Sequence, residues 1–162
     1  MKSVAALLLV LAPGWLLQEP SAEPARVELK LPVKVGAPGA LLKGKVLVTF
    51  APGWHGYQNP PTREYEIPLK IETKAKGVAL KVQYPKGEMK DFAGAQTAMY
   101  EGTVEVPFTL TLPKTAGVVS VKFDVNYQQC NSSTCLPPES LTVTEKLTVK
   151  KAPAKPPAKR KP

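Results

Sequence analysis

The chain has 162 residues, a formal net charge of +9, 43% hydrophobic residues, two cysteines and one histidine. This length suits one domain and leaves no room for a second large catalytic unit. The charge is concentrated at the C-terminus: residues 150–162 hold six basic residues and no acid, and residues 1–22 are neutral, which leaves +3 for residues 23–149. Such a mildly basic core gives no indication of a nucleic-acid partner.

Residues 1–22 are predicted to be a secretion signal. A positively charged start precedes an apolar run from Val4 to Leu17, and polar, proline-containing sequence follows. The run is shorter than the ~20 residues of a membrane span, and Pro13-Gly14 interrupts it. We expect cleavage near Ala22 and a periplasmic or otherwise extracytoplasmic protein that is soluble after cleavage. An uncleaved signal anchor is the alternative.

Residues 23–149 show the alternation of apolar and polar side chains that is typical of β-strands with one buried face. Glycine- and proline-rich turn signals separate the segments, and no segment keeps the period of a helix. The alternating segments are 27–35, 46–50, 67–71, 78–84, 104–112, 119–127 and 141–149. The predicted fold class is all-β: an immunoglobulin-like antiparallel β-sandwich of about seven or more strands.

Residues 150–162, KKAPAKPPAKRKP, are predicted to be a disordered basic tail. A sequence of lysine, alanine and proline buries too little apolar surface to offset the entropy lost on ordering. A solubilising role is the simpler interpretation. Weak contact with an anionic lipid or cell-envelope polymer is the alternative.

The two cysteines, Cys130 and Cys135, lie in one polar loop between the segments 119–127 and 141–149. Two cysteines of an exported protein usually pair. The spacing alone favours a loop staple, although closing a ring of six residues stabilises a fold by only ~2 kcal/mol. An accessible small-ring disulfide also suits exchange with another thiol pair, so both interpretations stay open.

The sequence around the cysteines is more specific than their spacing. The stretch 127–139, YQQCNSSTCLPPE, resembles the active-site segment of the N-terminal periplasmic domain of the thiol:disulfide interchange protein DsbD. Two further stretches agree in order and spacing: PGWHGY at 52–57, and 84–102 with its KDFAG segment, which resembles the cap-loop region of that family. The resemblance covers roughly residues 25–149.

The resemblance implies an immunoglobulin-like domain that passes electrons to thioredoxin-fold partners. Cys130 and Cys135 would then cycle between dithiol and disulfide, with no cofactor other than this redox-active disulfide. DsbD also has a membrane-embedded electron-transfer segment and a thioredoxin-like domain. Because this sequence contains no C-x-x-C, we expect electrons from thioredoxin-like proteins or from a separate membrane electron-transfer protein. The residues expected around the pair are Phe92, as a shielding cap, and His55, Tyr57, Tyr127 and Pro137.

A second function class is a non-redox secreted binding or adaptor β-sandwich with a structural loop disulfide. In that case Phe92 is an ordinary buried aromatic residue, and His55 is a turn residue with a satisfied hydrogen bond. One histidine without cysteine or carboxylate at motif spacing predicts no metal site. The redox hypothesis predicts a readily reduced pair that is nearly dispensable for folding, whereas the adaptor hypothesis predicts an inert disulfide that stabilises the fold.

Overall fold

The computed structural model describes residues 23–151, which form strands and contain no helix. No stretch of these residues is a helix able to cross a membrane. The predicted secretion signal, 1–22, lies outside the described residues, as do residues 152–162 of the predicted tail. The all-β prediction is confirmed.

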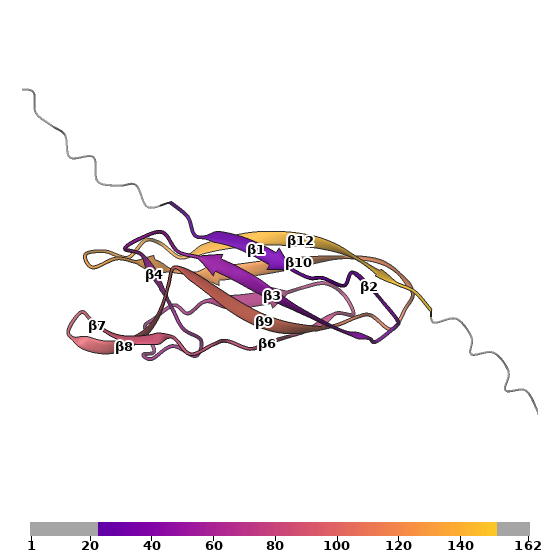
Figure 1. Cartoon of the computed structure of the whole chain (residues 1–162), viewed down its shortest axis with the longest axis horizontal. Coiled ribbons are helices and arrows are strands. Elements are labelled where there is room, and N and C mark those ends of the chain that lie inside the picture. The colour runs from indigo at the N-terminus through magenta and orange to yellow at the C-terminus, as the bar shows by residue number, and fades with distance from the viewer. Residues whose placement is uncertain (1–22, 152–162) are drawn as a thin grey trace, which may run out of the picture.

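Two four-stranded sheets face each other and form the sandwich (Figure 1). The first sheet contains, in spatial order, β1 (Arg26–Lys30), β3 (Leu41–Thr49), β9 (Thr103–Thr111) and β6 (Ala79–Val82). The second contains β2 (Val35–Gly36), β12 (Glu139–Val149), β10 (Gly117–Tyr127) and β5 (Lys70–Thr73). Neighbouring strands are antiparallel, except that β2 runs parallel to β12.

A third, smaller sheet lies at one end of the sandwich, on the left in Figure 1. Its strands are β11 (Gln129–Cys130), β4 (His55–Tyr57), β8 (Ala95–Glu101) and β7 (Glu88–Phe92), in that spatial order. The β7–β8 hairpin projects from this end, whereas β12 ends at the opposite end beside β2 (Figure 1). This third sheet carries one of the two cysteines.

The hydrophobic core lies between the first two sheets and follows the alternation of the sequence. In β10, Val121, Phe123 and Val125 are all 0% exposed, and the residue between the first two, Lys122, is exposed. The ring of Phe123 packs against Phe108 of β9 with centroids 5.2 Å apart, so this pair joins the two sheets. The long strands 103–111, 117–127 and 139–149 confirm the predicted segments closely.

The predicted first strand, 27–35, is divided in the structure. β1 ends at Lys30 in the first sheet, and the chain then crosses to the second sheet as β2. Pro32 lies between them and has no N–H to donate, so the ladder with β3 cannot continue through it. The alternation is unbroken across the proline, which explains why one strand was expected where there are two.

Candidate functional site

The cysteine loop is a short, internally ordered turn closed by a disulfide. Cys130 and Cys135 are bonded, and their Cα atoms are 4.0 Å apart. Inside the ring, Asn131 Oδ1 accepts hydrogen bonds from the backbone N–H groups of Ser133 and Thr134, at 2.9 and 2.8 Å. The backbone N–H of Asn131 donates to the carbonyl of Thr134 at 2.9 Å. Asparagine side chains often fix turns in this way. These hydrogen bonds therefore hold the loop in addition to the disulfide.

The exit of the loop is attached to Gln128 and Gln129 by two hydrogen bonds of the Leu136 backbone. Its N–H donates to the carbonyl of Gln129 at 3.0 Å, and its carbonyl accepts from Gln128 Nε2 at 2.9 Å. Pro137 comes next and is exposed. The structure therefore places Pro137 at the loop exit, where it fixes one backbone dihedral of the segment leaving Cys135.

The two sulfur-bearing residues differ in burial. Cys130 is 0% exposed, whereas Cys135 is exposed. Cys130 belongs to β11 and pairs with His55 of β4, whereas Cys135 follows the turn and forms a single β-bridge with Cys130. Of the two residues, Cys135 is therefore the one open to another protein, and Cys130 is enclosed.

The strand β4 presents two of the predicted site residues beside Cys130. His55 is directly opposite Cys130 in the antiparallel register, and Tyr57 is two residues further along the same face. Gly56, between them, faces Phe50, and a Cβ atom at Gly56 would lie 2.3 Å from the Phe50 Cζ. The glycine lets β4 lie flat on the core, so that the flanking side chains point toward the disulfide.

Tyr57 contacts both sulfur atoms. Its hydroxyl oxygen lies 3.3 Å from Cys130 Sγ and 3.9 Å from Cys135 Sγ, and its side chain is buried. Burial raises the pKa of the Tyr57 phenol, and the negative charge of Glu66 raises it further. The hydroxyl therefore keeps its proton at neutral pH and can donate a hydrogen bond to sulfur.

His55 is buried between aromatic rings. It is 5% exposed, and its ring meets Phe92 edge to face at 4.7 Å and Tyr57 at 5.7 Å between centroids. Burial lowers the pKa of His55; Glu101 opposes this shift and Lys90 adds to it. The imidazole is thus neutral at pH 7. Its Nε2 atom is enclosed without a hydrogen-bond partner among the described residues. His55 lies in strand β4, and not in a turn as the adaptor hypothesis expected.

Phe92 ends β7 and packs on His55, so it reaches the disulfide region through the imidazole. The two-residue turn after it, Ala93-Gly94, has positive φ angles of 50° and 76°. Positive φ at both central residues is the geometry of the tight hairpin turn that matches strand twist. Phe92 is half-buried, and its role as a shield of the sulfurs stays a prediction.

Tyr127 lies in the sandwich core and not beside the sulfurs. Its ring is 1% exposed and packs edge to face on Phe50, with centroids 6.0 Å apart. Its hydroxyl donates to Glu139 Oε2 at 2.6 Å and accepts from the backbone N–H of Ala25 at 3.1 Å. Burial, followed by the hydrogen bond to Glu139, raises the pKa of Tyr127. Tyr127 thus anchors the end of β10, from which the chain enters the cysteine loop.

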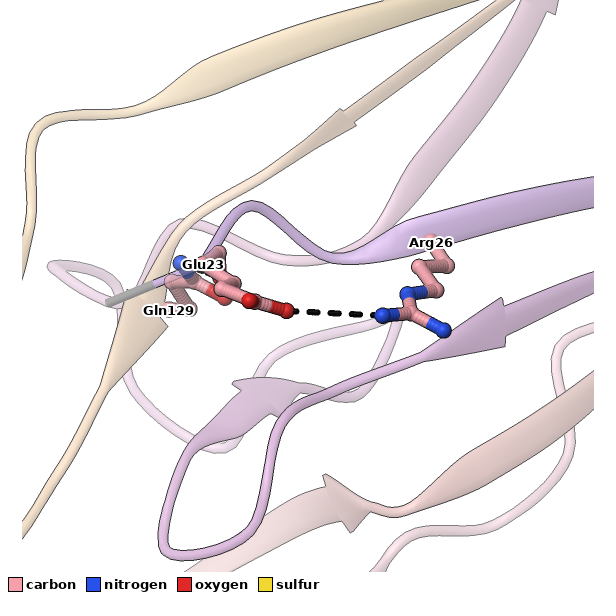
Figure 2. A network of polar contacts seen from close by, with 3 residues as sticks. All are labelled: Glu23, Arg26 and Gln129. Atoms are coloured by element: carbon pink, nitrogen blue, oxygen red, sulfur yellow. Dashed lines mark hydrogen bonds and ion pairs between the residues drawn. The ribbon is translucent and has the colours of Figure 1, made fainter. Parts of the chain in front are cut away.

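The first described residues also pack against the start of the cysteine loop. Gln129, next to Cys130, is 1% exposed, and its Nε2 donates to the carbonyl of Glu23 at 3.0 Å. Figure 2 shows Gln129 beside Glu23, whose carboxylate forms an exposed ion pair with Arg26 at 3.5 Å. The segment before β1 therefore contacts the residue adjacent to the buried cysteine.

Sequence reasoning missed Glu66, a buried carboxylate near the site. It is 5% exposed, and its Oε2 accepts from the backbone N–H groups of Thr62 and Arg63 at 2.8 and 3.1 Å. Its Oε1 accepts from Thr97 Oγ1 of β8 at 3.3 Å. Glu66 thus joins the loop after β4 to the third sheet, and no motif or period in the sequence marks it. Asn131 carried a signal, since asparagine is a common turn residue, but was not singled out.

The described residues hold no group of three or more His, Cys, Asp or Glu that could bind a metal ion.

The model of the family described as thiol:disulfide interchange protein DsbD, N-terminal, matches residues 22–147. The chain belongs to this family. The match spans the third sheet and both cysteines, so the resemblance expected from residues 25–149 is confirmed. Membership supports thiol–disulfide exchange as the chemistry of the Cys130–Cys135 pair.

One solved structure supports the fold, and a second is similar in part. The N-terminal periplasmic domain of ScsB from Proteus mirabilis matches with a TM-score of 0.59 and 21% identity, over 85% of this chain and 52% of that chain. This chain therefore spans about half the length of the ScsB structure. The reduced N-terminal domain of DsbD from Neisseria meningitidis has 20% identity and a TM-score of 0.46, over 75% of this chain and 85% of that chain. No curated protein matches the sequence.

Proposed function

We propose that this domain relays reducing equivalents outside the cytoplasm by thiol–disulfide exchange through Cys130 and Cys135. The observation that carries the proposal is the asymmetry of the pair: Cys135 is exposed, and Cys130 is enclosed with its Sγ 3.3 Å from the Tyr57 hydroxyl. The sulfur pair itself stores two electrons, so the exchange needs no other cofactor.

The difference in burial assigns an order to the two sulfurs. A partner thiolate attacks Cys135 Sγ, the bond between Cys135 and Cys130 breaks, and a mixed disulfide forms between the partner and Cys135. Cys130 leaves as a thiolate in a buried position, where an unpaired charge is unfavourable. The second partner thiol then attacks the mixed disulfide, which releases Cys135 and leaves the domain as a dithiol and the partner as a disulfide.

The Tyr57 phenol stabilises the leaving thiolate of Cys130. It is a donor at neutral pH because burial raises its pKa, and it already lies at hydrogen-bond distance from that sulfur. Hydrogen bonds to an ionised acceptor are roughly twice as strong as those between neutral groups. The contact therefore gains strength as the S–S bond breaks, which is when the charge appears.

The proposed partners are thioredoxin-like proteins, with a separate membrane electron-transfer protein as the alternative source of electrons. Family membership supports this class, since the family is that of a thiol:disulfide interchange protein. The ScsB structure is described as a periplasmic domain, which supports an extracytoplasmic location here. Contact of the basic tail with an anionic envelope surface stays a separate prediction.

The reduction potential of the Cys130–Cys135 pair tests the proposal. The protein would be equilibrated with glutathione or dithiothreitol and the fraction reduced measured by alkylation and mass spectrometry. A value of roughly −180 to −270 mV, the range of exchange proteins, is the expected result. A value well below roughly −300 mV would mark a structural disulfide and would favour the binding or adaptor module instead.

A trapping experiment tests the order of the sulfurs. The Cys130→Ala variant leaves Cys135 free to hold a partner, so it is expected to accumulate a mixed disulfide with a thioredoxin-like protein. Cys135→Ala is the matched control and is expected to trap little, because Cys130 is buried. Equal trapping by both variants would contradict the proposed order.

A further inference from the structure

The imidazole of His55 holds a buried polar atom that the oxidised protein does not use. Its Nε2 is enclosed and has no hydrogen-bond partner, and the whole residue is 5% exposed. Buried polar groups are nearly always paired, because an unpaired one costs about 1–3 kcal/mol. An exception next to a reactive bond points to a partner that exists in another state of the site.

Cys130 can supply that partner when it is reduced. It is directly opposite His55 across the β11–β4 pair, and such pairs have Cβ atoms about 5 Å apart. In the disulfide, the sulfur carries no hydrogen. After reduction the same sulfur is a thiol, which can donate one hydrogen bond.

The charges that face His55 come from two other strands and act on its pKa in opposite directions. Glu101 of β8 is opposite His55 in the register, and Lys90 of β7 pairs with Glu101 at 2.6 Å. The rings of Tyr57, on the same strand, and of Phe92, on β7, each pack edge to face with the His55 ring. Burial dominates and lowers the pKa of His55, which leaves the imidazole as a base at neutral pH.

We propose that His55 is the proton partner of Cys130. In the reduced protein, Nε2 accepts the S–H hydrogen bond of Cys130, and it takes that proton when Cys130 attacks a mixed disulfide on Cys135. This inference rests on the proposed exchange function and names the residue that makes the enclosed sulfur a nucleophile.

In this step the two cysteines are oxidised and the partner is reduced. Cys130 sulfur forms a bond to Cys135 sulfur, the bond between Cys135 and the partner breaks, and the partner leaves as a thiolate. The proton moves from Cys130 to His55 Nε2 and then to solvent. In the reverse direction, Cys130 leaves the disulfide as a thiolate, and a proton from solvent then reaches it through His55 Nε2.

Oxidation of the reduced protein by dithiobis(nitrobenzoate) separates the two thiols without any protein partner. The exposed Cys135 reacts first and releases one coloured thiolate; Cys130 then closes the disulfide and releases a second. In His55→Phe, the first phase is expected to keep its rate and the second to slow by roughly 100-fold, as is typical for loss of a general base. An unchanged second phase would overturn the proposal.

The pH profile separates a base from a residue that only packs. In the wild-type protein the second phase is expected to rise through the pKa of His55, which lies below 6.5 because of burial. In His55→Phe it should rise only toward the ordinary thiol pKa of about 8.5. Parallel profiles in the two proteins would mean that His55 acts through packing alone.

Nitrogen NMR of the wild-type ring covers the case in which His55→Phe does not fold. The Nε2 resonance of His55 is expected to differ between oxidised and reduced wild-type protein. In the reduced state, it is also expected to differ between the wild-type protein and Cys130→Ala, which has no thiol at this position. Equal resonances in these two reduced proteins would contradict the hydrogen bond. Neither experiment uses a thioredoxin-like protein, so failure to find such a partner would affect the proposed relay and not this inference.

Discussion

The sandwich and the third sheet differ in what they bury. Between the two large sheets the described core is apolar, as at Val121 and Phe123, both 0% exposed. The buried polar residues of the described chain lie elsewhere: His55, Glu66, Thr97 and Gln129. Three of these belong to the third sheet and the fourth is hydrogen-bonded to it.

The third sheet also holds both enclosed side-chain atoms that lack a partner in residues 23–151, His55 Nε2 and Gln129 Oε1. Gln129 precedes Cys130 in β11 and His55 is opposite Cys130 in β4, so both residues are neighbours of the buried cysteine along the sheet. The sandwich therefore buries mainly apolar groups, whereas the third sheet keeps unpaired polar atoms on residues that neighbour the cysteine pair. This division can be tested by substitutions on each side of it.

The largest effect is expected from Phe123→Ala in the sandwich. Removing a fully buried ring that packs on Phe108 should lower the free energy of unfolding by about 3–5 kcal/mol. Urea unfolding at fixed redox state measures this loss, and the reduction potential of the disulfide should stay the same. A large change in the reduction potential would show that packing of the core and the redox chemistry of the disulfide are energetically coupled.

The same division decides what the sequence could predict. Strands such as 119–127 alternate because one face meets the core and the other meets water, so their period is visible in the chain. β8 buries four consecutive residues, 97–100, and β4 buries all three of its residues. Strands covered on both faces have no alternation, so β4 and β8 were not predicted as strands. β7 was missed because it is exposed along most of its length, and β11 because it has only two residues.

The site residues were predicted by motif and not by period. The stretch 127–139 was specific enough to place Cys130 and Cys135, and PGWHGY placed His55 and Tyr57 beside them. Tyr127 was expected near the sulfurs but lies in the core, because sequence neighbours on a strand alternate between faces. Glu66 was missed because its contacts with Thr62, Arg63 and Thr97 depend on loop geometry.

The second effect is the loss of the disulfide itself. Unfolding of the reduced protein, or of Cys130→Ala/Cys135→Ala, should require about 2 kcal/mol less than that of the oxidised protein, because the ring is small. The loop bonds made by Asn131 remain in both. A loss above about 4 kcal/mol would mark a structural staple and would weaken the exchange proposal.

The third effect compares one hydroxyl at the site with one in the sandwich. Tyr57→Phe should slow reduction of the disulfide by dithiothreitol about tenfold, because a charge-assisted hydrogen bond to Cys130 sulfur is lost. Tyr84→Phe is the matched control, since the Tyr84 hydroxyl accepts from the backbone N–H of Ile71 at 2.8 Å. Tyr57→Phe and Tyr84→Phe should each lower the free energy of unfolding by about 1 kcal/mol. Equal rates in the two variants would exclude a chemical role for Tyr57.

The smallest effect concerns the hairpin that carries Phe92. Ala93 has a φ angle of 50°, which is unfavourable for alanine by about 1–2 kcal/mol but is tolerated better by asparagine. Ala93→Asn should therefore stabilise the hairpin by about 0.5–1 kcal/mol, seen as slower hydrogen exchange of the β7 and β8 amides. If Phe92 must move before a partner reaches Cys135, reduction by a thioredoxin-like protein should slow by about two- to fivefold, while reduction of urea-unfolded protein stays unchanged. Slower amide exchange with an unchanged rate of reduction would show that opening of the hairpin does not limit access to the disulfide.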